Sequence, residues 1–235
     1  MATRSRRPLL RSELMFCIPI ISRDNPEALK KMAVAEPLAD MLEIRLDFME
    51  TFDLHEIIKA ASKPLLVTYR SKREGGEGNA DPKTHTDYIL TAIQEGANLV
   101  DVELSLPRKW QEKIFDPRGR SDIISSIHIN DGTPPRQDLE KIFRDCAATN
   151  CDVVKIVTRA QTWGDNLRVL ELIPKAHDQR IKIIAFCMGP MGRISRVVSH
   201  LMGGYLTFAS LGGGEESAQG QIPIGQMREI IDILT

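Results

Sequence analysis

Eight short apolar runs alternate along the chain with stretches that carry helical signals, and this alternation restricts the possible folds more than any other feature. The expected strands lie at residues 14–21, 41–47, 65–70, 99–104, 122–129, 152–157, 181–187 and 205–209. An expected helix follows each of them, at 26–36, 53–61, 84–95, 107–115, 135–149, 163–176, 191–201 and 223–234. Strands that alternate with helices in this way predict an α/β fold with a parallel sheet.

The number of repeats distinguishes two α/β architectures. Eight strand–helix units in 235 residues favour a (β/α)8 TIM barrel, which commonly forms one domain of this length. An open, doubly wound sheet is the alternative, but no Gly-x-Gly-x-x-Gly sequence follows the first expected strand, which disfavours a dinucleotide-binding fold. We predict one barrel domain over residues 14–235, preceded by a basic extension over residues 1–13.

Composition disfavours several classes of partner. A formal net charge of −1 gives no overall field that would attract nucleic acid or an anionic membrane surface. No apolar run approaches the roughly 18 residues that a membrane-spanning helix needs. The four cysteines form no Cys-x-x-Cys pair, so we expect neither a zinc site nor a disulfide framework, and a reducing cytoplasm fits best.

Lys155 lies inside the β-branched run at 152–157, where a buried parallel strand is expected. Burial of an unpaired ammonium is costly and lowers the pKa of the amine. A neutral amine in a dry pocket is a nucleophile toward carbonyl groups and forms a Schiff base. The alternative is a structural lysine whose amine reaches solvent or pairs with an acid.

Charged or titratable residues also occur near the ends of the neighbouring expected strands. They are Glu43, Arg45, Arg70, Asp101, Glu103 and His128. In a barrel the active site lies at the carboxyl ends of the strands, so one shared aqueous pocket explains these residues best. Adjacent parallel strands should place His128 beside Lys155, where an imidazole could shuttle the protons that imine chemistry requires.

Structural roles remain open for several of these residues. Glu43 and Arg45 could instead form an ion pair inside the barrel. Arg70 could bind only the carbonyl groups of the following loop, and Asp101 could be a structural acid.

Two later segments predict anion binding and closure. Arg193 and the start of the helix after the seventh strand could hold a carboxylate, because a guanidinium binds it through a bidentate fork. The polar, Gly-rich segment 212–221 predicts a mobile lid. A phosphate site is the alternative there, but the two glutamates that follow the glycines would repel a phosphate dianion.

Several short motifs occur together in a recognisable order. They are Glu43-x-Arg45-x-Asp47, Thr68-Tyr69-Arg70-Ser71 with Glu74-Gly75-Gly76, Asp101-Val102-Glu103-Leu104, Ser126-x-His128, Val154-Lys155-Ile156, Met188-Gly189-x-x-Gly192-x-x-Ser195-Arg196, Leu206-Thr207-Phe208-Ala209 and Ser217-Ala218-Gln219-Gly220-Gln221. In this order and spacing the chain, from Cys17 onward, resembles type I 3-dehydroquinate dehydratase, the Schiff-base class of the shikimate pathway.

The resemblance implies a TIM barrel that dehydrates 3-dehydroquinate to 3-dehydroshikimate with no metal and no organic cofactor. It implies Lys155 as the imine-forming lysine, His128 as the general acid and base, and Glu103 as the acid that positions the histidine. The substrate contacts that it implies are Glu43, Arg45, Arg70, Arg193, Ser217 and Gln221. Because the family often dimerises, the resemblance also implies a homodimer.

One departure concerns the lid, where Gln219 replaces the proline that is common in the family. Loss of the fixed φ angle of proline predicts a more flexible open lid. Two other functions remain possible. A class I aldolase would also use a barrel lysine, and a non-catalytic barrel could bind a small carboxylate without turning it over.

Overall fold

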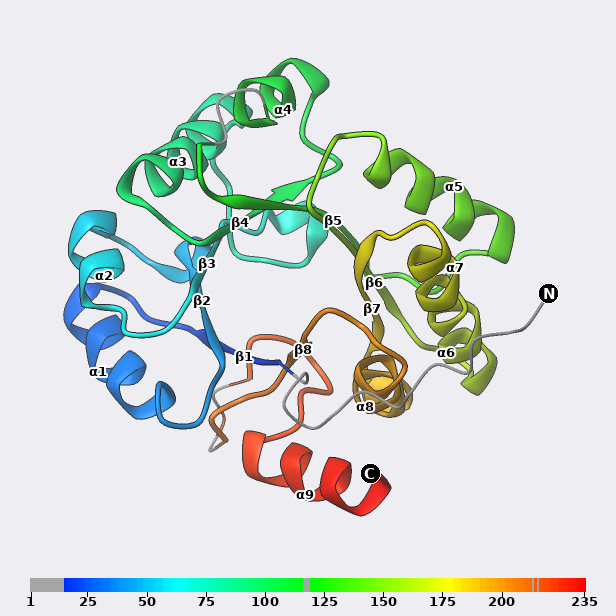
Figure 1. Ribbon diagram of the computed structural model, residues 1–235. Coiled ribbons are helices and arrows are strands. Elements are labelled where there is room, and N and C mark those ends of the chain that lie inside the picture. The colour runs from blue at the N-terminus through cyan, green and yellow to red at the C-terminus, as the bar shows by residue number, and fades with distance from the viewer. Residues whose placement is uncertain (1–14, 116–118, 213, 215) are drawn as a thin grey trace.

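In the part of the chain that the computed structural model describes (residues 15–115, 119–212, 214 and 216–235), eight parallel strands form one curved sheet. The strands are β1 (Phe16–Ile20), β2 (Met41–Arg45), β3 (Leu65–Thr68), β4 (Leu99–Glu103), β5 (Asp122–Ile129), β6 (Val153–Arg159), β7 (Lys182–Met188) and β8 (Thr207–Phe208). They surround a common centre with the helices outside (Figure 1). The predicted extension at 1–13 lies outside the described residues.

The strand order is that of a barrel. Strands β1 to β7 neighbour one another in chain order, and β8 pairs with β1. Across the remaining seam, Tyr205 N–H donates to Ile183 O at 2.7 Å, which joins the segment before β8 to β7. The prediction of a single (β/α)8 barrel is therefore confirmed, and the open doubly wound sheet is excluded.

Every strand is followed by at least one helix, as the alternation predicts. The helices are α1 (Asn25–Ala35), α2 (Leu54–Ala60), α3 (Pro82–Glu95), α4 (Arg108–Phe115), α5 (Arg136–Ala147), α6 (Trp163–Leu170), α7 (Leu172–Asp178), α8 (Arg193–Leu201) and α9 (Ile224–Leu234). Short 3-10 turns follow three strands: η2 (Leu46–Phe48), η3 (Lys72–Glu74) and η4 (Pro190–Gly192). Asp24, Asp53 and Asp81 accept backbone hydrogen bonds from the first turns of α1, α2 and α3, as N-caps do.

Two elements differ from the sequence prediction. The helix expected at 163–176 is two helices, α6 and α7, which meet at Glu171. Pro174 lies in the first turn of α7 and has no backbone N–H, so it cannot continue the hydrogen bonding of α6. The eighth strand is shorter than expected, because only Thr207 and Phe208 pair with β1.

The burial pattern of the strands explains where polar side chains gather. Most apolar residues of β1 to β7 are buried, both toward the helices and toward the barrel interior, as expected for a parallel sheet covered on both faces. Buried charged residues lie in β2, β4 and β6 and just beyond β2 and β3, and the half-buried His128 lies near the carboxyl end of β5. Within the described residues, no helix is long and apolar enough to cross a membrane.

Candidate active site

A pocket opens at the carboxyl ends of the strands and encloses about 510 Å³ of empty space, including its mouth. This size suits a small-molecule site. The pocket is lined by Glu43, Arg45, Thr68, Arg70, Glu74, Gly75, His128, Asn130, Lys155, Val157, Phe186, Met188, Arg196, Phe208, Ser217, Ala218 and Gln221. The structure thus brings together seven of the nine predicted site residues; Glu103 and Arg193 are not among the lining residues.

Lys155 extends from β6 into this pocket, and its side chain is only 5% exposed. Its ammonium is not unpaired, contrary to the premise of the sequence argument, because Nζ donates to Asp101 Oδ2 at 3.0 Å. The ammonium also lies 4.5 Å from the centroid of the Phe208 ring. Burial would raise the pKa of Asp101, but Arg70 and Lys155 outweigh it and hold that pKa well below its usual range. Asp101 is therefore an ionised acceptor beside the amine.

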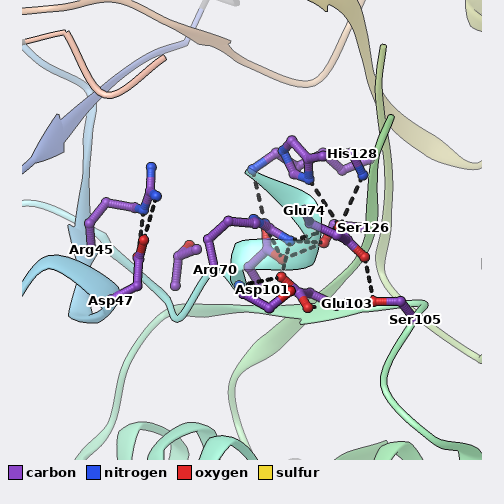
Figure 2. Close-up of polar contacts among 12 residues, drawn as sticks. Arg45, Asp47, Arg70, Glu74, Asp101, Glu103, Ser105, Ser126 and His128 are labelled. Carbon is purple, nitrogen blue, oxygen red and sulfur yellow. Dashed lines mark hydrogen bonds and ion pairs between the residues drawn. The ribbon is translucent and has the colours of Figure 1, made fainter. Parts of the chain in front are cut away.

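Arg70 is the centre of a buried ionic cluster (Figure 2). Its guanidinium pairs with three carboxylates: Nη2 lies 2.7 Å from Asp101 Oδ1, and Nη1 lies 3.1 Å from Glu103 Oε1 and 3.2 Å from Glu74 Oε2. Ser126 Oγ accepts from Arg70 Nη1 at 3.0 Å and donates to Asp101. A buried ion pair offsets its desolvation only with good geometry and further hydrogen bonds. Through these contacts Arg70 orders both the acid beside Lys155 and the acid beside His128.

Glu74 is the acid that contacts His128. Its Oε2 accepts from the His128 backbone N–H at 2.9 Å and lies 3.3 Å from Nδ1 of the ring. From sequence this contact is expected of Glu103, and the structure corrects the expectation. Glu103 is in register with Ser126, not with His128, and its Oε1 accepts from Arg70 and from the Ser71 backbone N–H.

The glycine-rich loop after β3 allows Glu74 to reach His128. A Cβ atom at Gly76 would lie 2.2 Å from the carbonyl oxygen of Arg70, so only glycine permits this fold-back. Gly75 has φ +83°, a conformation that glycine adopts without strain. Sequence reasoning missed Glu74 as a site residue, although it stands in the quoted Glu-Gly-Gly motif.

His128 is half-buried, with 11% of its side chain exposed at the pocket. Burial and the positive charges of Arg70 and Lys155 lower its pKa well below the usual value, against the opposing effect of Asp101. The imidazole is therefore neutral at pH 7 and can accept a proton, which is the state that a general base needs.

Glu43 and Arg45 do not form the ion pair that was considered from sequence. Arg45 makes a two-point pair with Asp47, Nε to Oδ1 at 2.8 Å and Nη2 to Oδ2 at 2.7 Å. Glu43 Oε1 instead accepts from Thr68 Oγ1 at 2.7 Å. Both residues line the pocket from β2.

Arg196, not Arg193, is the arginine of the pocket wall after β7. Arg193 is exposed, whereas Arg196 is 1% exposed and lies over the Phe186 ring at 4.5 Å. The hydroxyl of Ser195 accepts from Cys187 N–H at 2.8 Å, which fixes the first turn of α8 with residues 195 and 196 inward. The Ser195-Arg196 pair of the quoted motif was the signal that could have indicated this.

The guanidinium of Arg196 differs from that of Arg70, because none of the ion pairs among the described residues involves it. Its Nε is buried without a hydrogen-bond partner there, and its Nη2 donates to Gln219 O at 3.3 Å. Burial lowers the pKa of Arg196 to about 10. A buried cation of this kind is suited to receive a carboxylate from a ligand.

The predicted lid covers the pocket from the β8 side, although its residues 213 and 215 lie outside the described residues. Ser217 and Gln221 bind each other, with Ser217 N–H donating to Gln221 Oε1 at 2.8 Å and Gln221 Nε2 donating to Ser217 Oγ at 2.9 Å. Gly220 has φ +81°, and a Cβ there would lie 2.6 Å from Gly189 O. This close approach seats the lid on the loop after β7.

The described residues contain no cluster of three or more His, Cys, Asp or Glu side chains that could hold a metal ion. The groups that the pocket does offer are an amine, a neutral imidazole, carboxyl groups and the guanidinium of Arg196, which takes part in none of the ion pairs among the described residues. The fold and this pocket together define a TIM-barrel enzyme whose site is suited to carbonyl and proton-transfer chemistry on a small carboxylate.

Comparisons with known proteins identify the family. A family model described as Type I 3-dehydroquinase matches residues 16–235. The chain is 34% identical over 215 residues to 3-dehydroquinate dehydratase of Thermococcus gammatolerans, covering 92% of this chain and 96% of that protein. It is 32% identical over 231 residues to the chloroplastic bifunctional 3-dehydroquinate dehydratase/shikimate dehydrogenase of Arabidopsis thaliana, covering 96% of this chain but 37% of that protein.

A solved structure agrees with the sequence relatives. The crystal structure of 3-dehydroquinate dehydratase from Geobacillus kaustophilus superposes with a TM-score of 0.86 at 28% identity, covering 95% of this chain and 91% of that one. The chain belongs to the type I 3-dehydroquinase family, as its motifs indicated.

Proposed function

We propose that this protein catalyses the dehydration of 3-dehydroquinate to 3-dehydroshikimate, in the shikimate pathway, through a Schiff base on Lys155. The observation that carries the proposal is the placement of the buried Lys155 amine, beside Asp101, in one pocket with a neutral His128. Membership of the type I 3-dehydroquinase family supports the choice of substrate.

Imine formation is the first stage. Once Lys155 has lost a proton, its amine attacks the C3 carbonyl carbon, and the resulting carbinolamine loses water to give a protonated imine. His128 shuttles the protons of this stage. The iminium withdraws electrons from C2 and acidifies its C–H bond, which is the purpose of covalent catalysis here.

Elimination is the second stage. His128 removes the C2 proton, and the electron pair passes to the imine nitrogen as an enamine. The enamine then expels the C1 hydroxyl, which leaves as water with the proton that His128 holds. Hydrolysis of the product imine restores Lys155, so one molecule of water is lost overall and no electrons leave the substrate.

The surrounding charges support this sequence of proton transfers. In its ionised form, Glu74 accepts the Nδ1–H of His128 and leaves the Nε2 lone pair free to act as the base. Glu103 acts on the histidine indirectly, through Arg70 and Glu74. Asp101 receives the ammonium of Lys155 in the resting enzyme.

Substrate binding uses further residues that line the pocket. Arg196 holds the substrate carboxylate, and Ser217 and Gln221 exchange their mutual hydrogen bonds for contacts with the substrate as the lid closes. Glu43, Arg45 and Arg70 face the hydroxyl groups from β2 and β3. No metal or organic cofactor takes part.

The test of this function is an absorbance assay for the conjugated enone that dehydration creates. Purified protein should form the enone from 3-dehydroquinate, and a class I aldolase or a non-catalytic carboxylate-binding barrel should not. Absence of the enone under conditions where the protein is folded would refute the proposal.

We also propose that the enzyme is cytoplasmic and forms a homodimer. The described cysteines are all free, as in a reducing compartment. Trp163 and Leu167 on α6 and Ile194 on the adjacent α8 are 64%, 66% and 51% exposed, and exposed apolar patches mark contact surfaces. Sedimentation equilibrium should give twice the chain mass; a monomer at micromolar concentration would contradict the dimer.

A further inference from the structure

Ser105 donates a hydrogen bond to Glu74, the acid that contacts His128. It lies in the turn after β4, outside the residues that line the pocket. Its hydroxyl donates to Glu74 Oε1 at 2.6 Å and is 3.5 Å from Glu103 Oε2. Figure 2 shows Ser105 and His128 on opposite sides of the Glu74 carboxylate.

The two oxygens of Glu74 therefore have separate partners. Oε1 receives the Ser105 hydroxyl. Oε2 receives the His128 backbone N–H, approaches the His128 ring at 3.3 Å and pairs with Arg70. Since rotation of the carboxylate would break the hydrogen bond at Oε1, Ser105 keeps Oε2 directed at the imidazole.

We infer that Ser105 is a positioning residue that keeps Glu74 ionised and oriented, so that His128 retains the tautomer whose Nε2 is the base. The inference rests on the proposed function for its catalytic consequence, but its geometric content concerns only Ser105, Glu74 and His128. Neither the sequence motifs nor the pocket lining indicate Ser105.

The charges around Glu74 explain why one hydroxyl matters. Burial raises the pKa of Glu74 to about 7, and the carboxylates of Glu103 and Asp101 act in the same direction. Arg70 and the Ser105 hydrogen bond oppose them. His128 faces Glu74 from β5, and Lys72 and Arg73 precede it on its own turn.

The protonation state of Glu74 decides which proton His128 carries. An ionised Glu74 can only accept, so the ring proton lies on Nδ1. A protonated Glu74 can donate to Nδ1, which moves the ring proton to Nε2 and removes the base. Loss of the Ser105 hydroxyl removes a hydrogen-bond donor that favours ionised Glu74. Glu74 then stays protonated up to a higher pH, and His128 stays in the tautomer that cannot act as the base.

The decisive experiment follows the ¹⁵N signals of the His128 ring against pH in the substrate-free protein, with His128 assigned by the signals lost in His128→Ala. In wild type the ring signals should change with a midpoint near pH 7, where Glu74 titrates. In Ser105→Ala the midpoint should lie about one pH unit higher. Ser105→Thr, which keeps the hydroxyl, should return it close to the wild-type midpoint.

Ser121→Ala is the matched control, because the Ser121 hydroxyl is also largely buried but binds Ala97 O at 2.6 Å, away from the cluster. Its midpoint should equal that of wild type. A Ser105→Ala midpoint equal to that of wild type, or an equal displacement in Ser121→Ala, would overturn the inference.

The catalytic consequence is measured separately. The acid limb of kcat/KM for enone formation should move upward with the spectroscopic midpoint in Ser105→Ala, with the alkaline plateau unchanged. If the wild-type protein forms no enone, the proposed function fails, and the spectroscopic midpoint still decides the role of Ser105.

Discussion

The two arginines buried in the pocket wall, Arg70 and Arg196, differ in their polar partners. Arg70, after β3, pairs with three carboxylates whose side chains are at most 3% exposed. Arg196, on α8, is equally buried, but among the described residues its Nε has no hydrogen-bond partner and its Nη2 donates to a lid carbonyl. The comparison indicates that one guanidinium organises the protein's own acids, and that the other is kept for the charge of the substrate.

This difference divides the pocket into a proton-transfer wall and a binding wall. The side chains of the proton-transfer wall (Arg70, Asp101, Glu103, Glu74, Ser126, His128 and Lys155) hold one another through hydrogen bonds and ion pairs, so its geometry is fixed before substrate arrives. The binding wall (Arg196, Ser217 and Gln221) holds contacts that a substrate can replace. Each prediction below perturbs one wall and leaves the other as a reference.

Loss of the base should have the largest effect on rate. His128→Ala should lower kcat by roughly 10²–10⁴-fold, the usual contribution of a general base, with little change in substrate affinity. Because Lys155 remains, the variant should still form the imine slowly. A kcat within a few-fold of wild type would remove His128 from the mechanism.

Loss of the Arg70 guanidinium should affect stability more than that of Arg196. Arg70→Met leaves three buried carboxylates without the guanidinium that they share, and breaking a buried pair typically costs about 3–5 kcal/mol. Arg196→Met removes a buried cation that has no carboxylate partner among the described residues, so its free energy of unfolding should be unchanged or higher. Urea denaturation of both variants measures the contrast, and equal destabilisation would contradict it.

Removal of the binding guanidinium should weaken the substrate complex. A charge-assisted hydrogen bond contributes about 1.5–3 kcal/mol, so Arg196→Leu should lower kcat/KM by about 10–150-fold. Arg193→Leu is the matched control, because Arg193 is exposed on the same helix, and it should remain close to wild type. A larger loss in Arg193→Leu would restore the original assignment.

The smallest effect is expected in the lid. Gln219→Pro should restrict the open lid and favour closure by about 0.4–1 kcal/mol, which corresponds to about a two- to five-fold lower KM. Gln219→Ala does not fix φ and should leave KM unchanged. If both variants behave alike, the side chain matters and not the backbone restriction.

Periodicity along the sequence was sufficient to predict the barrel, and alternation within strands was sufficient to place Lys155 and His128 in one pocket. It was not sufficient for contacts made through turns. Glu74 contacts His128, 54 positions away in the sequence, because the loop after β3 folds back at Gly76. The alternation of apolar and polar residues in the strands does not predict this fold-back. The choice between Arg193 and Arg196 depended on where η4 ends and α8 begins, which the Ser195 hydrogen bond sets.

Glu103 shows a further limit of the sequence analysis. Glu103 shares a strand face with Asp101 as predicted, and Arg70 binds both. The alternation of side chains along β4 does not reveal, however, which residue of the neighbouring strand lies opposite Glu103. The register places it opposite Ser126, two residues before His128. Long-range register and loop closure, not residue type, decided these contacts.

Borohydride reduction in the presence of 3-dehydroquinate tests the central claim most directly, because it converts an imine into a stable secondary amine. The protein should gain one adduct, which peptide mass spectrometry locates on Lys155. Lys155→Met should gain none, and Lys141→Met, on an exposed helix face, should be labelled as wild type. A wild-type protein that turns over the substrate without an adduct, or with the adduct on another lysine, would contradict the account.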